Sequence, residues 1–312
     1  MRTMKACAVL FLLSCVIAVR ESRGLDLLAS LGTTESDDIT AVAARASNDY
    51  VRARLANGSF APESYVFGNG GLWPDGTRDA SIDKLTFLDV AHTIAFPLEG
   101  RNYLPSKDPK TTRLLIMVYW GGTQSQDQPN QSAAYASLQD AIDSMNRARM
   151  LGDSVQMRGG SLLQAQGQMD VALSLVTAAN RARDDADFRT AKLLGYDSWW
   201  DDSAPGYFVN PARERRFEDL LYELEDGRYF VVLMAYDFQL MWKQKKHKLL
   251  WETRFSIRQR HHEFDRDLPV MAQFASQYFG QDSHGLVHEK IPLGRVDVGE
   301  PKSLGEVGAP SK

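Results

Sequence analysis

Two apolar runs, separated by about a hundred residues, constrain the fold of this chain most strongly. The first, "LLIMVYW" from Leu114 to Trp120, is apolar at seven consecutive positions and ends at two glycines. The second, "YFVVLMAYDFQLMW", runs from Tyr229 to Trp242, with Asp237 as its single acid. Runs that are apolar on both faces indicate strands in the interior of a sheet rather than at its edge. We therefore expect the chain to fold around a buried sheet.

The segment between these runs has a helical pattern. After the polar linker "TQSQDQPNQS", apolar residues recur at helical spacing up to Leu194, and again in "ARERRFEDLLYELEDG". We expect residues 123–226 to be an all-helical insertion into an α/β core formed by residues 60–122 and 227–282. The predicted fold class is α/β (α+β-like), with a mixed sheet of about four strands and packed helices.

The remaining segments complete the predicted organisation. Residues 36–58 have the pattern of an N-terminal helix, with Ser36 as its cap and an Asn-Gly stop. Residues 81–98 are predicted to form an amphipathic helix, and another helix is predicted after Asp267, the expected cap. Residues 283–312 are punctuated by Gly and Pro and are predicted to be an irregular tail.

Alternation after the second apolar run predicts a β-hairpin. Leu249 to Ile257 alternates apolar and polar residues, as a half-buried strand does. Antiparallel partners share a face of the sheet, so the even positions of the preceding strand should pair with the odd positions of this one. With a turn of even length, Asp237 then lies opposite Arg254. The sequence therefore predicts a cross-strand Asp237–Arg254 ion pair.

The N-terminus has the layout of a secretory signal peptide. Arg2 and Lys5 precede a short apolar stretch, and residues 1–18 end in Val-Ile-Ala, a small-residue cleavage pattern. "LLSC" also resembles a bacterial lipobox, which makes Cys15 a candidate lipid-attachment site; an uncleaved anchor or no export is the third alternative. We expect an exported bacterial protein, in the periplasm or associated with the outer membrane. A lipid on Cys15 would be its sole membrane attachment.

Cysteine usage and charge restrict the class of protein further. The chain has 2 cysteines, both in the leader, so the mature chain contains no disulfide. The formal net charge of −4 offers no basic face for nucleic acid, so we expect no nucleic-acid partner.

Two patterns bear on catalysis and metal binding. "SIDK" from Ser81 to Lys84 matches the S-x-x-K pattern of serine acyl-enzymes, but its companion motifs are absent, and Ser81 also fits as a helix N-cap. The histidine clusters at His261-His262 and at His284 and His288 lack the spacing of a zinc-binding helix. We therefore expect no catalytic residue, no metal and no cofactor.

An acidic-aromatic loop at residues 196–208 is the strongest candidate for ligand contact. Adjacent aromatic rings and carboxylates suit stacking on sugars, and the candidates are Trp199, Trp200, Asp201 and Asp202. The alternative is that the two tryptophans anchor the loop by packing, which is the commoner use of buried aromatic area. A basic turn from Lys243 to Lys248 suits anionic lipid, another envelope polymer or a solvated turn that discourages edge pairing.

The order of these segments resembles small α/β domains of bacterial envelope proteins. In "PLEGRNYLPSKDPKTTRLLIMVYW" a helix leads into an apolar strand, and "LLW" opens the second strand of the predicted hairpin. Both features are similar to the outer-membrane lipoprotein activators of peptidoglycan synthases and to the amino-terminal domain of TolB, over residues 81–122 and 228–282. The resemblance implies a non-catalytic interaction module that binds another envelope protein or a cell-wall component. The alternative is a periplasmic carbohydrate-binding protein or hydrolase that uses the acidic-aromatic loop.

Overall fold

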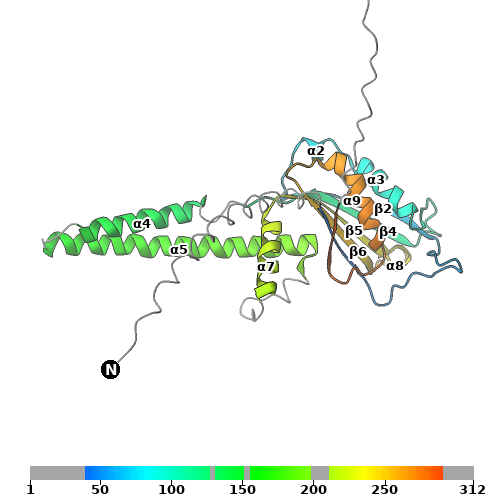
Figure 1. The fold of residues 1–312 in the computed structure, drawn as a ribbon. Helices are drawn as coiled ribbons and strands as arrows, with labels where there is room; N and C mark the ends of the chain where they lie inside the picture. The colour runs from blue at the N-terminus through cyan, green and yellow to red at the C-terminus, as the bar shows by residue number, and fades with distance from the viewer. Residues whose placement is uncertain (1–38, 127–130, 151–154, 198–210, 291–312) are drawn as a thin grey trace, which may run out of the picture.

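The computed structural model describes residues 39–126, 131–150, 155–197 and 211–290. They form an α/β fold around a mixed seven-stranded sheet, from which a long helical hairpin projects (Figure 1). The sheet order is β3-β2-β4-β5-β6-β1-β7; β2 is parallel to β3 and β4, and the other pairs are antiparallel. None of the helices in these ranges combines the length and the hydrophobicity that a membrane-spanning segment needs.

A helical segment, α4 to α7, separates the first four strands from the last three. The strands are β1 Ile39–Ala46, β2 Glu63–Leu72, β3 Tyr103–Pro105, β4 Leu114–Gly122, β5 Arg228–Asp237, β6 Leu249–Arg258 and β7 Leu286–Lys290. The helices are α2 Ala80–Asp83, α3 Phe87–Glu99, α4 Ala133–Met150, α5 Val155–Leu194, α7 Pro211–Glu225, α8 Phe238–Gln244 and α9 Phe264–Ala275, followed by the 3₁₀ turn η2 Ser276–Tyr278.

The sheet separates two hydrophobic cores. Helices α3 and α9 cover one face, where Ile94 and Met271 are fully buried against Trp251 of β6. The end of α5 and helix α7 cover the other face, where Leu194 and Leu224 pack in one cluster with strand residues. The central strands therefore bury side chains on both faces, which explains their uninterrupted apolar runs.

Some elements match their predictions closely. β4 and β5 occupy the interior of the sheet, as their apolar runs predicted. The described part of residues 123–226 contains α4, α5 and α7 and no strand. α5 ends at Leu194, next to Gly195 in a left-handed conformation (φ +85°).

The predicted N-terminal helix over 36–58 is wrong. Residues 39–46 form β1, which lies between β6 and β7, and its small side chains are buried. A Cβ on Gly195 would lie 2.5 Å from Ala43 Cβ, so the end of α5 rests on this strand where Ala leaves room. Alanine favours a helix in isolation. In this strand the close packing of α5 requires small side chains, so tertiary contacts override the helix propensity of alanine.

The predicted hairpin register is also wrong. In the structure Val231 lies opposite Phe255, and Arg254 lies opposite Val232. The chain leaves the strand at Asp237, whose carboxylate accepts a hydrogen bond from Leu240 N and caps α8. Because both faces of β5 are apolar, its pattern did not reveal which positions share a face with β6.

Other boundaries differ from the predictions in smaller ways. The sheet has seven strands rather than about four, partly because residues 286–290 of the predicted tail pair with β1 as an edge strand. The predicted helix over 81–98 is two helices, capped by Asp79 and by Thr86. The helix expected to start at Asp267 begins at Phe264.

Candidate functional site

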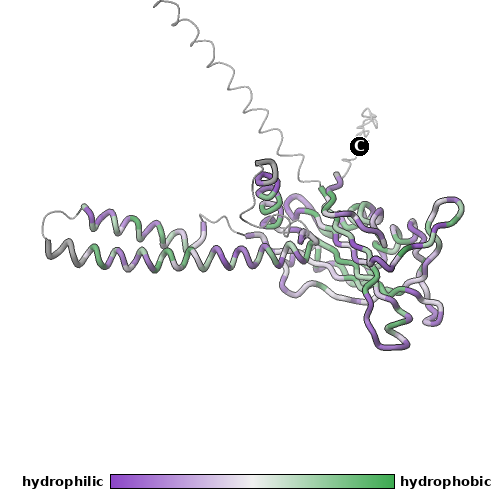
Figure 2. The backbone as a smooth tube through the Cα atoms, turned by 90° about the horizontal axis from the view of Figure 1, so that it is seen from below, coloured by the Kyte–Doolittle hydropathy of each residue, from purple (hydrophilic) through white to green (hydrophobic). Residues whose placement is uncertain are grey.

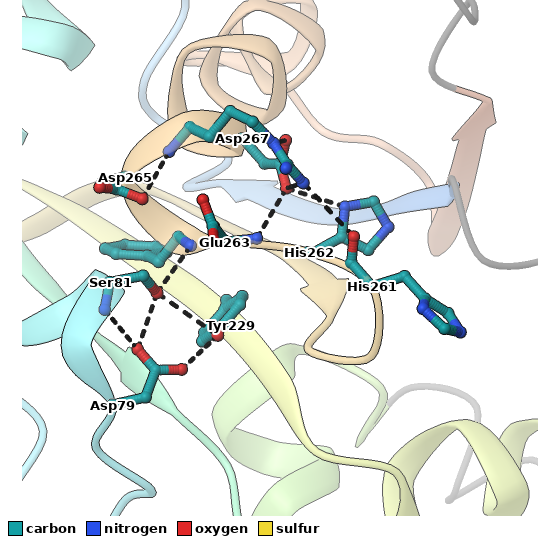
Figure 3. Close-up of polar contacts among 10 residues, drawn as sticks. Asp79, Ser81, Tyr229, His261, His262, Glu263, Asp265 and Asp267 are labelled. Atoms are coloured by element: carbon teal, nitrogen blue, oxygen red, sulfur yellow. Dashed lines mark hydrogen bonds and ion pairs between the residues drawn. The ribbon is translucent and has the colours of Figure 1, made fainter.

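The S-x-x-K serine is part of a buried polar cluster. Ser81 Oγ donates to Asp79 Oδ1 (2.7 Å) and accepts a hydrogen bond from Phe264 N (2.9 Å) (Figure 3). The Tyr229 hydroxyl donates to the other oxygen of Asp79. Burial opposes ionisation of Asp79, but the hydroxyls of Tyr229 and Ser81 outweigh it and lower the pKa of this carboxyl. The cluster joins the start of α2, strand β5 and the first turn of α9.

The lysine of the S-x-x-K pattern makes no hydrogen bond to Ser81 in the described part of the chain. Lys84 lies on the surface, with its Nζ 3.4 Å from Asp265 Oδ2. An acyl-enzyme serine needs a neighbouring base within hydrogen-bond reach. Ser81 instead has a carboxylate that accepts its proton in a hydrogen bond, and Asp79 rather than Ser81 caps α2. We assign the cluster a structural role.

The histidines are dispersed. His262 Nδ1 lies 2.9 Å from Asp267 Oδ2 at the start of α9 (Figure 3). His288 on β7 contacts Glu223, and His284 is exposed in a turn. Within the described residues, no group of three or more His, Cys, Asp or Glu side chains could hold a metal ion.

A polar cavity of about 420 Å³ lies beside the segment that follows β1. The Arg52 guanidinium is stacked between the rings of Phe60 and Tyr103, with its carbon 4.3 Å and 3.9 Å from their centroids. The Tyr50 hydroxyl donates to Glu63 Oε2 (2.6 Å), and this carboxylate lies 3.8 Å from Arg52 Nε. These contacts hold the segment against β2 and β3.

The charges around this cavity balance one another. The basic residues that line it are Arg52, Arg113 and Lys248, and the acidic residues are Asp49, Glu63 and Asp237. Lys248 pairs with Asp49, which also explains one residue of the predicted basic turn. The lining therefore carries three basic and three acidic side chains, so its formal charge is zero.

The second face of the sheet holds a buried ionic network. Arg228 of β5 is enclosed, with its Nη1 2.8 Å from Glu223 Oε1 on α7 and its Nε donating to Ser256 Oγ (3.0 Å). Tyr196 and His288 also contact the Glu223 carboxylate, at 2.8 Å and 3.0 Å. Burial opposes ionisation of Glu223, but Arg228 and His288 outweigh it and lower its pKa to about 2. The network fixes the base of the helical insertion to three strands.

Beyond this base, α4 and α5 project as an antiparallel pair that we call the arm (residues 133–150 and 155–190; Figure 1). At 1.5 Å per residue, the 40 residues of α5 span roughly 60 Å. Alanines buried at heptad spacing form the seam between the helices: Ala141, Ala148, Ala165 and Ala172. None of the arm residues whose side chains the structure describes belongs to either hydrophobic core.

The arm exposes apolar side chains along its length. Figure 2 shows apolar positions distributed among polar ones on both helices. Leu163 is 72% exposed and Val171 is 61% exposed. Val171 and Leu175, which is 47% exposed, lie one helical turn apart and therefore share one face of α5. In the sequence, the heptad spacing of the four alanines is the signal that α4 and α5 pair with each other. The prediction of a helical insertion did not rest on that spacing.

The ligand-contact and lipid-attachment residues predicted from the sequence lie outside the described residues: Trp199, Trp200, Asp201, Asp202 and Cys15. Of the acidic-aromatic loop, the structure describes Tyr196 and Asp197. Tyr196 is buried in the ionic network, and Asp197 pairs with Arg45 at 3.0 Å. Both residues serve the fold.

Comparison with known proteins gives little similarity. No family model matches the chain, and no curated protein has significant sequence similarity to it. Among solved structures, a PDZ domain protein from Parabacteroides distasonis ATCC 8503 aligns with a TM-score of 0.35 at 11% identity, over 85% of this chain and 42% of that one. The chain therefore spans less than half of that protein's length, and at this TM-score the likeness supports no functional conclusion.

Proposed function

We propose that this chain is an exported bacterial envelope protein that acts without catalysis, by binding another envelope component through its arm. The observation that carries this proposal is the position of the arm outside both cores. The described side chains of the outer arm, residues 137–175, lie in neither core, and Leu163, Val171 and Leu175 are exposed there. A partner bound to the arm would cover these apolar side chains.

The leader and the polar clusters support the same function. The N-terminal sequence favours export, and Lys84, the lysine of the acyl-enzyme pattern, pairs with Asp265 at the surface rather than with Ser81. The partner we expect is an envelope protein or a cell-wall component, in the periplasm or at the outer membrane.

Fractionation and mass spectrometry test the location. We expect the chain in the envelope fraction, beginning after Ala18 or at a lipid-modified Cys15. A full-length cytosolic chain that retains Met1 would contradict the proposal.

Replacing the outer arm tests the binding role. A variant in which a short Gly/Ser turn replaces residues 137–175 should keep the cooperative unfolding of the body, because neither core loses a side chain. It should lose its association with the envelope partner. A matched control replaces Leu88 and Phe96, exposed on α3, with Lys and should bind as the natural chain does. Equal binding by the arm variant would remove the arm from the function.

A further inference from the structure

A groove of about 680 Å³ runs along one side of the arm, between α4 and α5. From α4 it is lined by Asp140, Ser144 and Arg147, which recur at i, i+4 and i+7 and therefore share one face of the helix. From α5 it is lined by Val171 and Leu175, which are 61% and 47% exposed. The groove thus combines an apolar side with a charged side.

Asp140 and Arg147 are two opposite charges that line the groove from α4. They lie seven residues apart on α4, so about 10 Å of helix separates them, too far for them to pair with each other. Both are exposed, and neither makes an ion pair with any side chain that the structure describes. Ser144, a small residue, lies between them.

A second copy of the same helix satisfies this arrangement. When two α4 helices meet antiparallel about a twofold axis near Ser144, Asp140 of each copy lies opposite Arg147 of the other. A twofold interface repeats each contact, so one stripe supplies both ion pairs. The same packing places α5 against the α5 of the other copy, which covers Val171 and Leu175.

We infer that the arm binds a second copy of this chain, forming an antiparallel four-helix bundle around Ser144. This inference rests on the proposed function of the arm and names its partner. An unrelated helix could cover the apolar side, but the self-complementary spacing of Asp140 and Arg147 is what a symmetric contact requires. The polar half of the groove predicts an association that salt weakens.

Sedimentation equilibrium of the purified mature chain tests the inference. The natural chain should show a monomer–dimer equilibrium. Asp140→Arg and Arg147→Asp should each weaken it at least about tenfold, because each substitution creates two like-charge contacts per dimer. The control Asp143→Arg, on the same helix but outside the groove lining, should leave it unchanged.

Two rescue experiments separate lost pairing from lost folding. The double variant Asp140→Arg/Arg147→Asp restores both ion pairs and should dimerise. An equimolar mixture of the two single variants should form a heterodimer, since two arginines on one copy then face two aspartates on the other. Circular dichroism should show unchanged helix content in every variant.

A natural chain that stays monomeric at every soluble concentration would overturn the inference. Single variants that dimerise as tightly as the natural chain, or a mixture of the two that stays monomeric, would also overturn it. These results leave the proposed function standing if the arm still binds another envelope component. Conversely, a dimer of a chain that remains in the cytosol would overturn the proposed location and keep the self-association.

Discussion

Glu223 Oε1 on α7 lies 2.8 Å from Arg228 Nη1 on β5, and water reaches little of either side chain. This pair joins the base of the helical insertion to the interior of the sheet.

Glu223→Gln should destabilise the protein by about 3 kcal/mol, because it leaves the Arg228 charge enclosed without a counter-ion. Urea unfolding at neutral pH measures this change. The control Glu218→Gln, exposed on the same helix, should change stability by under about 0.5 kcal/mol. Similar losses in both variants would contradict the role of the pair.

The stabilisation by Glu223 should also depend on pH. Its pKa is about 2 in the folded protein against an ordinary 4.5. A carboxyl whose folded pKa is depressed stabilises fully above its unfolded pKa and loses that effect as the pH falls. The difference between the natural chain and Glu223→Gln should therefore shrink from pH 4.5 toward pH 2. A difference that stays constant over this range would argue against an ionised Glu223.

Asp187 predicts the opposite dependence. Burial and the nearby Glu225 raise its pKa to about 6 from 3.8, although Gln126 Nε2 donates to it and Arg183 lies near. The folded protein then binds the proton more tightly than the unfolded chain, so this contribution falls as the pH rises from about 4 to 6. Asp187→Asn should be more stable than the natural chain at pH 7, by up to about 3 kcal/mol. A less stable Asn variant at pH 7 would show that the charge is favourable.

Ser81→Ala should cost about 1–3 kcal/mol, because it removes the buried acceptor of Phe264 N. Lys84→Ala, at an exposed surface pair, should cost less than about 1 kcal/mol. Neither the natural chain nor the Lys84 variant should react with a fluorescent penicillin or a fluorophosphonate. Covalent labelling of Ser81 would instead establish a serine nucleophile.

The central strands were predictable from sequence and their register was not. Residues apolar on both faces require a central strand, which located β4 and β5. Because both faces of these strands are apolar, the sequence does not show on which side of the sheet each residue lies. Phe230 and Val231, for example, are both buried, on opposite sides. A strand with one polar face would have shown whether its odd or its even positions face the core.

The candidate site was only partly predictable for a similar reason. Helical periodicity identified α4 and α5, but alanine at 141 and 148 is a weak apolar signal, so their pairing into an arm did not emerge. Asp140 and Arg147 could not be picked out from the sequence, because only the structure shows the groove that they line. The Glu223–Arg228 pair joins a helix to a strand across a chain reversal that periodicity does not describe.

Gly195→Ala should destabilise the protein by at least about 1–2 kcal/mol, because its backbone is left-handed and its new Cβ would meet Ala43 at 2.5 Å. The control Gly100→Ala has a right-handed helical backbone and its nearest atom at 3.5 Å, and it should be nearly neutral. Thermal unfolding measures both changes. Equal melting temperatures would contradict the close contact between the end of α5 and β1.

Photo-crosslinking in intact cells tests the binding role of the arm most directly. The photo-reactive amino acid p-benzoylphenylalanine replaces Val171 on the arm or, as the control, Leu88 on the body; both positions are exposed. The account predicts a discrete adduct from position 171, of twice the chain's mass where a second copy is the partner, and none from position 88. No adduct at position 171, or the same adducts at both positions, would contradict it.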